Sequence, residues 1–380
     1  TDHKLSCSQP TKLNKQGYYF NAKMWVSWLV VLTMLQQCTL GNARRKRTIE
    51  DKNLGLLFKS APEMYEDFPL EAQKPIPHWL QGQLFRNGPG QFEMGDRKVH
   101  HIYDAFCKIT SFKLLGNKTI LYTSKFVGTG YYRDSKRLDT IAPYMMFDGA
   151  EPPFSTVESM EALLHGIDNP ITSVYQLGDN SADFVAVGDF YELYKLDKQS
   201  LETIEKVEPE LPGRSSVLSL LPIPLPSCGH PLKEYNAETF INFVSELSVI
   251  PFVDNTISIV RMFNAKKREV ISRFKVDRIP YMHSFGLTPS HVILFGAPMY
   301  VLTYKILETI NPSQSLEWVK SEPTTFYVIN IKTGNVQIMK TETVFGMHHV
   351  NSYHVKPHIV RMDFITYPDL EFTKSMTLDI

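Results

Sequence analysis

Short runs of apolar and β-branched residues recur along most of the chain. Most runs span about five to eight residues, are rich in Val, Ile, Phe, Tyr and Thr, and are bounded by Gly, Pro, Asn or Asp. This pattern is typical of strands connected by turns. The runs lie at residues 118–127, 173–178, 182–197, 238–247, 256–263, 268–276, 291–304, 324–334, 335–345 and 358–367. We therefore expect a chain built mainly from short strands.

Two of the connections carry explicit hairpin signals. Residues 332–335, Lys-Thr-Gly-Asn, lie between two alternating runs, and residues 196–200 join the two strands of the sequence YKLDKQSLETIEKV. Gly, Asn and Asp adopt the backbone conformations that tight turns require. Helical periodicity is confined to residues 159–164 and 301–310. The helices expected here are therefore few and short.

The number of strands points to a particular all-β architecture. Ten or more strands over about 330 residues favour a closed radial arrangement, because radial repetition leaves only short, protected sheet edges. We interpret the chain as all-β, a β-propeller whose blades are irregular because no fixed-period repeat is present. Two consecutive sandwiches are the alternative. Residues 62–79 hold four prolines, which lack the N–H groups that a continuous ladder of strand hydrogen bonds requires. We therefore interpret this stretch as an extended segment that leads into the first strands.

The composition is that of an ordinary globular protein. Hydrophobic residues make up 43% of the 380 residues, and charged residues make up 21%. Lys plus Arg equals Asp plus Glu at 40 each, so no positive excess is available to neutralise phosphates, and we expect no nucleic-acid partner. The four cysteines form no CxxC pair, and we interpret them as free thiols rather than a zinc or disulfide framework. They are Cys7, Cys38, Cys107 and Cys228.

The beginning of the chain differs from the rest. We set residues 1–50 apart as a leader and treat residues 51–380 as one domain. The apolar part of the leader is too short to cross a bilayer, which takes about 20 residues. Together with the small residues that follow it, segment 24–41 resembles a secretory signal. The basic cluster at residues 44–47 does not fit a signal, and a membrane-surface segment is the alternative.

Two apolar loops interrupt the strand pattern. Residues 215–226 have the sequence SSVLSLLPIPLP, and residues 143–147 have the sequence PYMMF. Exposed apolar loops line binding cavities or enter the interface of a membrane. We expect a peripheral membrane contact through these loops. A packed connection inside the fold is the alternative for each.

Three histidines occupy similar positions at the beginning of predicted structural units. His230 lies between a glycine and a proline, His283 precedes a Ser-Phe-Gly turn and a strand, and His348 precedes another strand. In a propeller, equivalent positions of successive blades converge on the axis. Imidazoles gathered there, without cysteines or paired carboxylates, suit a divalent first-row metal such as iron. A packed core histidine is the alternative for each, and His349 and His354 are competing candidates.

Five sequence blocks occur in a fixed order between residues 62 and 367. They are PHWLQGQLFRNGPGQFEMG, SLETIEKV, GHPLKEYNAETFINF, MHSFGLTPSHVILF and MHHVNSYH. These blocks resemble those of the carotenoid cleavage oxygenases, the family of the animal carotene dioxygenases and the retinoid isomerohydrolase of the retinal pigment epithelium. On these blocks the chain is identified as a member of that family.

The resemblance implies a seven-bladed β-propeller capped by loops and short helices, with one iron(II) per chain held by four histidines. His230 matches the first ligand through its His-Pro motif, and His283 matches the second through His-Ser-Phe-Gly. His348 matches the third through His-x-x-Asn, which selects His348 over His349. The fourth ligand is expected beyond Ile380, so the propeller domain is expected to be incomplete at its C-terminal end.

Three sequence features depart from the family pattern. Asp189 stands where the family has a glutamate that orients a ligand imidazole, and its side chain is one methylene shorter. Tyr103, Asp104 and Ala105 replace the usual Phe-Asp-Gly, and His354 replaces the glutamate of HxxNxYE. These departures bear on activity rather than on the fold.

The resemblance implies an iron(II)-dependent dioxygenase that cleaves one double bond of a carotenoid with O2 and releases retinal or an apocarotenal. A retinoid isomerase or isomerohydrolase and a non-catalytic carotenoid-binding protein are the alternatives. An apolar tunnel is expected for the polyene, although core packing is favoured for most of the large side chains near the ligand blocks. These are Tyr281, Met282, Phe285, Phe345 and Met347. The family location is cytoplasmic with membrane association, in contrast to the export that the leader suggests.

Overall fold

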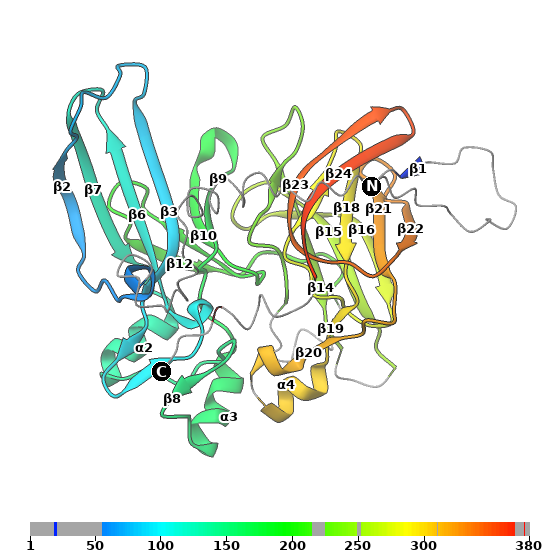
Figure 1. The fold of residues 1–380 in the computed structure, drawn as a ribbon, viewed down its shortest axis with the longest axis horizontal. Coiled ribbons are helices and arrows are strands. Elements are labelled where there is room, and N and C mark those ends of the chain that lie inside the picture. Colours follow the sequence, from blue (N-terminus) through cyan, green and yellow to red (C-terminus); the bar gives the residue numbers. More distant parts are fainter. Residues whose placement is uncertain are drawn as a thin grey trace, which may run out of the picture. The chain divides into compact units, whose positions relative to one another are not determined.

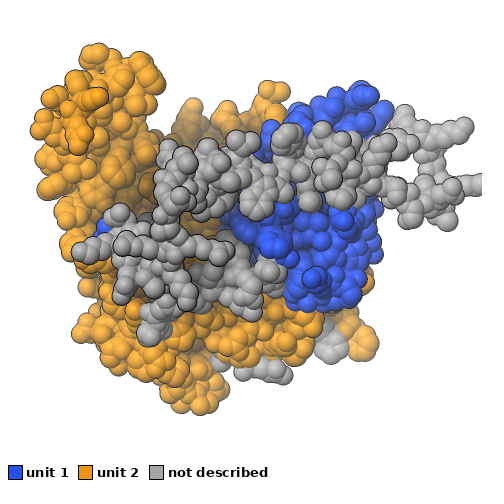
Figure 2. Space-filling view, in the orientation of Figure 1, with its two compact units in different colours: residues 1–58, 280–300, 318–375 blue, residues 59–279, 301–317, 376–380 orange. Residues whose placement is uncertain are grey.

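The computed structural model describes residues 19–20, 55–214, 225–248, 252–309, 311–368 and 376. The described chain consists mainly of strands, with few and short helices, as expected (Figure 1). It divides into two compact units, each assembled from separate stretches of chain (Figure 2). Unit 1 comprises Thr1–Phe58, Pro280–Tyr300 and Trp318–Ser375, and unit 2 comprises Lys59–Ile279, Val301–Glu317 and Met376–Ile380.

Within the described residues, unit 2 contains three four-stranded sheets and one three-stranded sheet. The first sheet has the order β2 (Tyr65–Glu71), β7 (Thr119–Phe126), β6 (Phe106–Leu114), β3 (Gly82–Gln91). The second has the order β12 (Thr203–Val207), β11 (Leu193–Leu196), β10 (Asp183–Val187), β9 (Ser173–Leu177). The third has the order β13 (Leu232–Lys233), β14 (Phe240–Glu246), β15 (Asn255–Met262), β16 (Arg268–Val276). The small sheet consists of β4 (Glu93–Met94), β5 (Arg97–Val99) and β8 (Ala150–Glu151).

The described part of unit 1 contains one four-stranded sheet and one three-stranded sheet. The four-stranded sheet has the order β17 (Phe285–Leu287), β18 (His291–Gly296), β21 (Thr324–Asn330), β22 (Val336–Thr341). The three-stranded sheet has the order β1 (Tyr19–Phe20), β24 (Ile359–Tyr367), β23 (Phe345–Lys356). Two further strands, β19 (Met299–Val301) and β20 (Leu316–Trp318), pair with each other. Each contains a point where the sequence changes from one unit to the other.

The order of strands favours propeller blades over sandwiches. In three of the four-stranded sheets the neighbours follow one another along the chain and pair antiparallel, apart from the short pair inserted between β18 and β21. A blade is such a four-stranded meander, whereas sandwich strands alternate between two sheets by Greek-key connections. The blade count of seven stays a prediction.

Two helices confirm the expected helical stretches, and a third was missed. Helix α3 (Thr156–His165) includes the stretch expected at residues 159–164, and helix α4 (Thr303–Thr309) lies within the stretch expected at residues 301–310. The missed helix, α2 (Gly130–Leu138), has the polar sequence GYYRDSKRL. Its stability comes from tertiary and capping contacts, because the buried Asp168 accepts a hydrogen bond from the Gly130 N–H at 2.7 Å. The short 3₁₀ helices are η1 (Gly55–Phe58), η2 (Ile102–Asp104), η3 (Asp179–Ser181) and η5 (Pro312–Ser315). None of the helices in the described stretches is long and apolar enough to cross a membrane.

Both hairpin turns are confirmed, and the proline-rich stretch holds a strand that was not expected. Gly334 adopts φ +72° and donates to the Asn330 carbonyl at 2.8 Å between β21 and β22, while residues 197–202 connect β11 to β12. Residues 62–79 form no continuous ladder, as expected, but β2 within them pairs with β7 through Pro69, with a register shift between Tyr65 and Phe68. Proline is tolerated there because β2 is the edge strand of its sheet.

The apolar side chains of the strands form the cores of the two units. Cys107 and Cys228 are buried, and burial raises the pKa of both thiols, which keeps them in the unreactive thiol form. Residues 143–147 also belong to the core of unit 2, where Tyr144, Met145 and Met146 are at most 8% exposed. The expected membrane contact at these residues is therefore wrong, because the side chains pack inward. Residues 1–18, 24–41 and 215–224 lie outside the described residues.

Candidate metal site

Two of the predicted ligand histidines meet in unit 1. His283 lies two residues before β17, and His348 lies inside β23. Their Nε2 atoms are 3.2 Å apart, their ring centroids are 4.8 Å apart, and their ring planes are at 90°. Both side chains are half-buried. The fold thus brings together two imidazoles that are 65 residues apart in the sequence.

The separation of these nitrogens fits two ligands of one metal ion. Imidazole nitrogens bind first-row divalent metals at about 2.1 Å, so two ligands at a right angle lie about 3.0 Å apart. The 3.2 Å between the Nε2 atoms of His283 and His348 is close to that value. Imidazole nitrogen suits iron, zinc and copper, whereas calcium and magnesium prefer oxygen ligands. The pair therefore fits neighbouring positions on a first-row metal.

His348 is placed by an irregular part of β23. The expectation that it begins a structural unit is wrong, because β23 already begins at Phe345. Pairing with β24 shifts register between Gly346 and His349 and again between His349 and Asn351. Such bulges redirect the side chains of a strand and are common beside functional sites. The double shift around His349 is the local feature that determines where the adjacent histidines point.

The structure distinguishes His348 from its neighbour His349. The His349 Nε2 atom lies 2.9 Å from the Ser352 hydroxyl, and the ring also hydrogen-bonds to the backbone of Asn351. Burial lowers the pKa of His349 to about 4, so its ring is neutral near pH 7. Both hydrogen bonds of the His349 ring are to residues of its own strand, which supports the sequence-based preference for His348.

His230 belongs to unit 2 and lies in the turn before β13, as expected. Its N–H contacts the sulfur of Cys228 at 3.2 Å, and Asn242 donates to the Cys228 carbonyl at 2.9 Å. Gly229 packs so closely on Thr172 that an added Cβ would lie 2.5 Å from the threonine methyl carbon. A side chain at residue 229 would therefore displace the turn. The flanking glycine fixes the backbone that carries His230.

Asp189 anchors the same turn. Its Oδ1 atom accepts a hydrogen bond from the Gly229 N–H at 3.1 Å, and its carbonyl accepts one from the Ser227 N–H at 2.8 Å. Both contacts hold the backbone directly before His230. The orientation of a ligand imidazole by Asp189 stays a prediction.

His354, one of the departures from the family pattern, belongs to a second histidine group in unit 1. The Ser290 hydroxyl lies 2.9 Å from Nδ1 of His291 and 3.1 Å from Nε2 of His354. The side-chain amide nitrogen of Asn330 lies 3.5 Å from Nε2 of His291. Sequence reasoning missed this group because its residues come from β18, β21 and β23 and from the turn before β18.

The glycine-rich block that forms β3 has a structural role. The Asn87 amide donates to the Pro170 carbonyl at 2.6 Å, which ties β3 to the segment before β9. An added Cβ on Gly90 would lie 2.4 Å from the Cβ of Lys108 on β6. The block therefore specifies close packing rather than chemistry.

Asp104, in the Tyr-Asp-Ala departure, is a buried anchor. Its carboxylate accepts hydrogen bonds from the N–H groups of Phe147 and Asp148 at 2.5 and 2.9 Å. The Tyr131 hydroxyl donates to the Asp104 carbonyl at 3.1 Å. Burial raises the pKa of Asp104 to about 7. The residue fastens the loop before β8 to η2.

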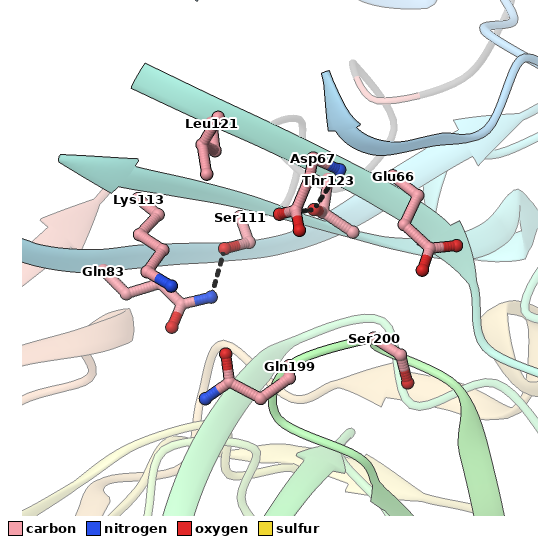
Figure 3. A pocket seen from close by; sticks show the side chains of 9 residues that line it. All are labelled: Glu66, Asp67, Gln83, Ser111, Lys113, Leu121, Thr123, Gln199 and Ser200. Carbon is pink, nitrogen blue, oxygen red and sulfur yellow. Dashed lines mark hydrogen bonds between the residues drawn. The ribbon is translucent and has the colours of Figure 1, made fainter. Parts of the chain in front are cut away.

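Unit 2 also contains a polar pocket of about 130 Å³, shown in Figure 3. Gln83 donates to the Ser111 hydroxyl at 2.7 Å, and the Asp67 N–H donates to Thr123 Oγ1 at 3.1 Å. The remaining lining residues are Glu66, Lys113, Leu121, Gln199 and Ser200. No histidine or cysteine lines this pocket, and its walls are too polar for a conjugated hydrocarbon.

Most of the large side chains near the ligand blocks belong to the core. Met282, Phe285, Phe345 and Met347 are each at most 6% exposed, and Tyr281 is half-buried. Core packing, the interpretation favoured from the sequence, is thus confirmed for the four buried side chains. The apolar tunnel stays a prediction.

A family model described as retinal pigment epithelial membrane protein matches residues 58–379. Among curated proteins, the chain is 25% identical to the beta,beta-carotene 15,15'-dioxygenase of Gallus gallus, over 82% of this chain and 61% of that protein. It is 27% identical to the carotenoid isomerooxygenase of Drosophila melanogaster, over 80% of this chain and 49% of that protein. It is 24% identical to the apocarotenoid-15,15'-oxygenase of Synechocystis sp., over 82% of this chain and 62% of that protein. The chain thus spans between about half and two-thirds of the length of these relatives.

Solved structures are similar over most of the chain. A variant of the Synechocystis apocarotenoid oxygenase aligns with a TM-score of 0.68 at 21% identity, over 86% of this chain and 66% of that chain. A cobalt-substituted form of the Synechocystis oxygenase aligns with a TM-score of 0.65 at 20% identity, over 82% of this chain and 63% of that chain. At this identity the likeness establishes a shared fold.

Proposed function

Because the chain belongs to the retinal pigment epithelial membrane protein family, which includes the carotenoid oxygenases, we propose that it binds iron(II) and cleaves a carotenoid with O2. The observation that carries the proposal is the 3.2 Å approach of the His283 and His348 Nε2 atoms. Iron held by His230, His283 and His348 is the ligand set that the family motifs imply. When bound, iron(II) supplies the site at which O2 is activated.

The proposed ligands and the residues around them affect the charge and the geometry of the site. His283 and His348 contribute neutral nitrogen donors, so the ligands leave the charge of a divalent metal uncompensated. Asp189 accepts a hydrogen bond from the Gly229 N–H, and Asn242 donates one to the Cys228 carbonyl, so the turn that carries His230 is held in one backbone position. The His349 ring, neutral and half-buried, adds no charge beside the pair.

The substrate class follows from the relatives. Two of these relatives are named for beta,beta-carotene and for apocarotenoids, so a carotenoid polyene is the proposed substrate. Cleavage breaks one carbon–carbon double bond and adds one atom of O2 to each carbon, which gives two carbonyl products. The relative named carotenoid isomerooxygenase supports a second candidate, in which cleavage is coupled to isomerisation of the polyene.

The test is an assay with the purified protein, β-carotene, ferrous iron and O2. Retinal or an apocarotenal is the expected product, and His283→Ala is expected to form none. The His354→Ala variant serves as the matched control, since His354 lies in the same unit but in the Ser290 group. Iron-loaded protein that forms no carbonyl product from any carotenoid would contradict oxidative cleavage. Turnover of a retinyl ester without O2 consumption would instead indicate the isomerohydrolase reaction.

A peripheral membrane contact is part of the proposal, through helix α3. Val157, Met160 and Leu164 are 75%, 65% and 71% exposed and share one face of the helix, given its period of 3.6 residues. The helix is fixed by a Ser155–Glu158 capping box and by a 2.7 Å ion pair between Glu158 and Arg97. Carotenoids partition into bilayers, so the proposed occupant of this apolar face is a lipid surface.

Flotation with liposomes tests this contact. The Val157→Glu, Leu164→Glu double variant is expected to lose liposome association that the parent protein has. Ile204→Glu is the control, because Ile204 is an exposed apolar residue on β12 outside α3. Equal flotation of all three proteins would contradict a role for α3.

A further inference from the structure

The two segments that carry His283 and His348 are joined by the residues directly after them. The N–H of His349 donates to the Ser284 hydroxyl at 3.0 Å, so a hydrogen bond connects the position after one histidine to the position after the other. Ser284 is half-buried, and the segments are 65 residues apart in the sequence. This link lies one residue from the imidazole pair on each side.

The pairing of β23 with β24 is irregular around the residue that donates this hydrogen bond. His349 itself pairs with Phe364, but the register shifts between Gly346 and His349 and again between His349 and Asn351. A backbone N–H that is removed from water needs an acceptor, and the Ser284 hydroxyl supplies one for His349. The hydrogen bond therefore fixes β23 to the His283 segment at a point where its ladder with β24 is irregular.

The ring of His349 braces the same link. It contacts the Ser352 hydroxyl at 2.9 Å, and Ser352 is 2% exposed. Gly286 on β17 allows this packing, because a Cβ there would lie 2.4 Å from the Ser352 hydroxyl and 3.4 Å from the His349 ring. The Ser and Gly of His-Ser-Phe-Gly thus both contact the His349 segment.

We propose that Ser284 is a positioning residue for the candidate metal site, and that it fixes the separation of His283 and His348 through its hydrogen bond to His349. This inference rests on the proposed metal function. Without the hydroxyl, β23 loses its hydrogen bond to the His283 segment, and the His348 imidazole is expected to shift from the distance that suits a metal. Loss of a group that positions a ligand typically weakens metal binding about 10–100-fold.

The experiment measures Co²⁺ affinity and the visible Co²⁺ spectrum of the purified protein after metal removal. Ser284→Ala is expected to weaken binding about 10–100-fold and to change the spectrum, whereas Ser284→Thr, which keeps the hydroxyl, restores both. Ser290→Ala is the matched control, because it removes a hydroxyl that bridges two histidines of the other group in the same unit. Parent-like affinity of folded Ser284→Ala would overturn the proposal, as would equal weakening by Ser290→Ala.

A metal-free measurement separates this inference from the proposed function. In the apo protein, the ¹⁵N shifts of the His283 and His348 rings are expected to change in Ser284→Ala and to stay unchanged in Ser290→Ala. If the parent protein binds no Co²⁺, the metal function fails and these shifts alone decide whether Ser284 positions the pair. Unchanged shifts in Ser284→Ala would then overturn the inference, and thermal melting confirms that each variant is folded.

Discussion

Unit 1 contains two pairs of histidines that differ in what separates the rings. In the first, the Nε2 atoms of His283 and His348 face each other at 3.2 Å with perpendicular rings. In the second, the rings of His291 and His354 are 5.9 Å apart, and the Ser290 hydroxyl lies between their nitrogens. Both pairs join a segment at β17–β18 to β23. Only the first leaves two nitrogens directed at a common point.

The second pair is linked by hydrogen bonds through a serine. The side-chain Oδ1 of Asn330 accepts from the backbone N–H groups of Lys332 and Thr333, so its amide nitrogen faces His291. The Ser290 hydroxyl lies 2.9 Å from Nδ1 of His291 and 3.1 Å from Nε2 of His354. These contacts occupy three of the four ring nitrogens, and Nδ1 of His354 is buried without a hydrogen-bond partner. Proximity of histidines is therefore a weak sign of a metal site, whereas direct convergence of nitrogens is a stronger one.

The largest expected effect is the loss of metal binding when one ring of the first pair is removed. His348→Ala is expected to weaken Co²⁺ affinity by more than about 100-fold, beyond what loss of an outer partner costs. His354→Ala is expected to keep the parent affinity, because its ring binds the Ser290 hydroxyl. Calorimetric titration of both variants checks this contrast. Equal affinities of the two would break the distinction between the pairs.

The next largest effect concerns the packing that supports the first pair. Gly286→Ala is expected to destabilise the fold by about 1–3 kcal/mol, because its Cβ would meet the buried Ser352 hydroxyl. Gly88→Ala is the control, since a Cβ there meets nothing within 4 Å. Denaturant unfolding of both variants gives the difference in free energy of unfolding. A stable Gly286→Ala protein would show that this region tolerates movement.

The smallest effect is the pH dependence of the second pair. Burial, and then repulsion from His354, lowers the pKa of His291 below its usual value of 6.5. The unfolded chain therefore binds more protons, so stability is complete above about pH 6.5 and declines as the pH falls below it. The contribution has a slope of at most about 1.4 kcal/mol per pH unit.

The His291→Gln variant tests that contribution. Its free energy of unfolding is expected to fall less steeply than that of the parent between pH 6.5 and 5. Histidines that do not interact with His291 contribute equally to both proteins and cancel, so the difference reports on His291 and its coupling to His354. Parallel pH profiles would mean that the second pair carries no proton-linked stability.

Particular elements show how far the sequence alone could go. The β-branched and aromatic residues of 268–276 and 324–330 predicted β16 and β21, because such side chains are enriched in strands. Helix α2 was missed because Asp168, 37 residues after Tyr131, helps to cap its first turn. The strand β2 was missed because a proline is permitted only on an edge, and a single sequence does not say which strand is an edge.

The features of the candidate site are likewise of two kinds, those that the sequence determined and those that only the tertiary structure decided. The amino-acid sequence by itself determined the strand-rich fold and the family blocks, and it selected His348 over His349, because these depend on residue types at short spacing. Only the tertiary structure decided that the His283 and His348 nitrogens converge, that a serine separates His291 from His354, and that Ser284 binds the His349 backbone. Each of those contacts joins residues about 64 or more positions apart, and their distances follow from strand register and bulges that local patterns do not encode.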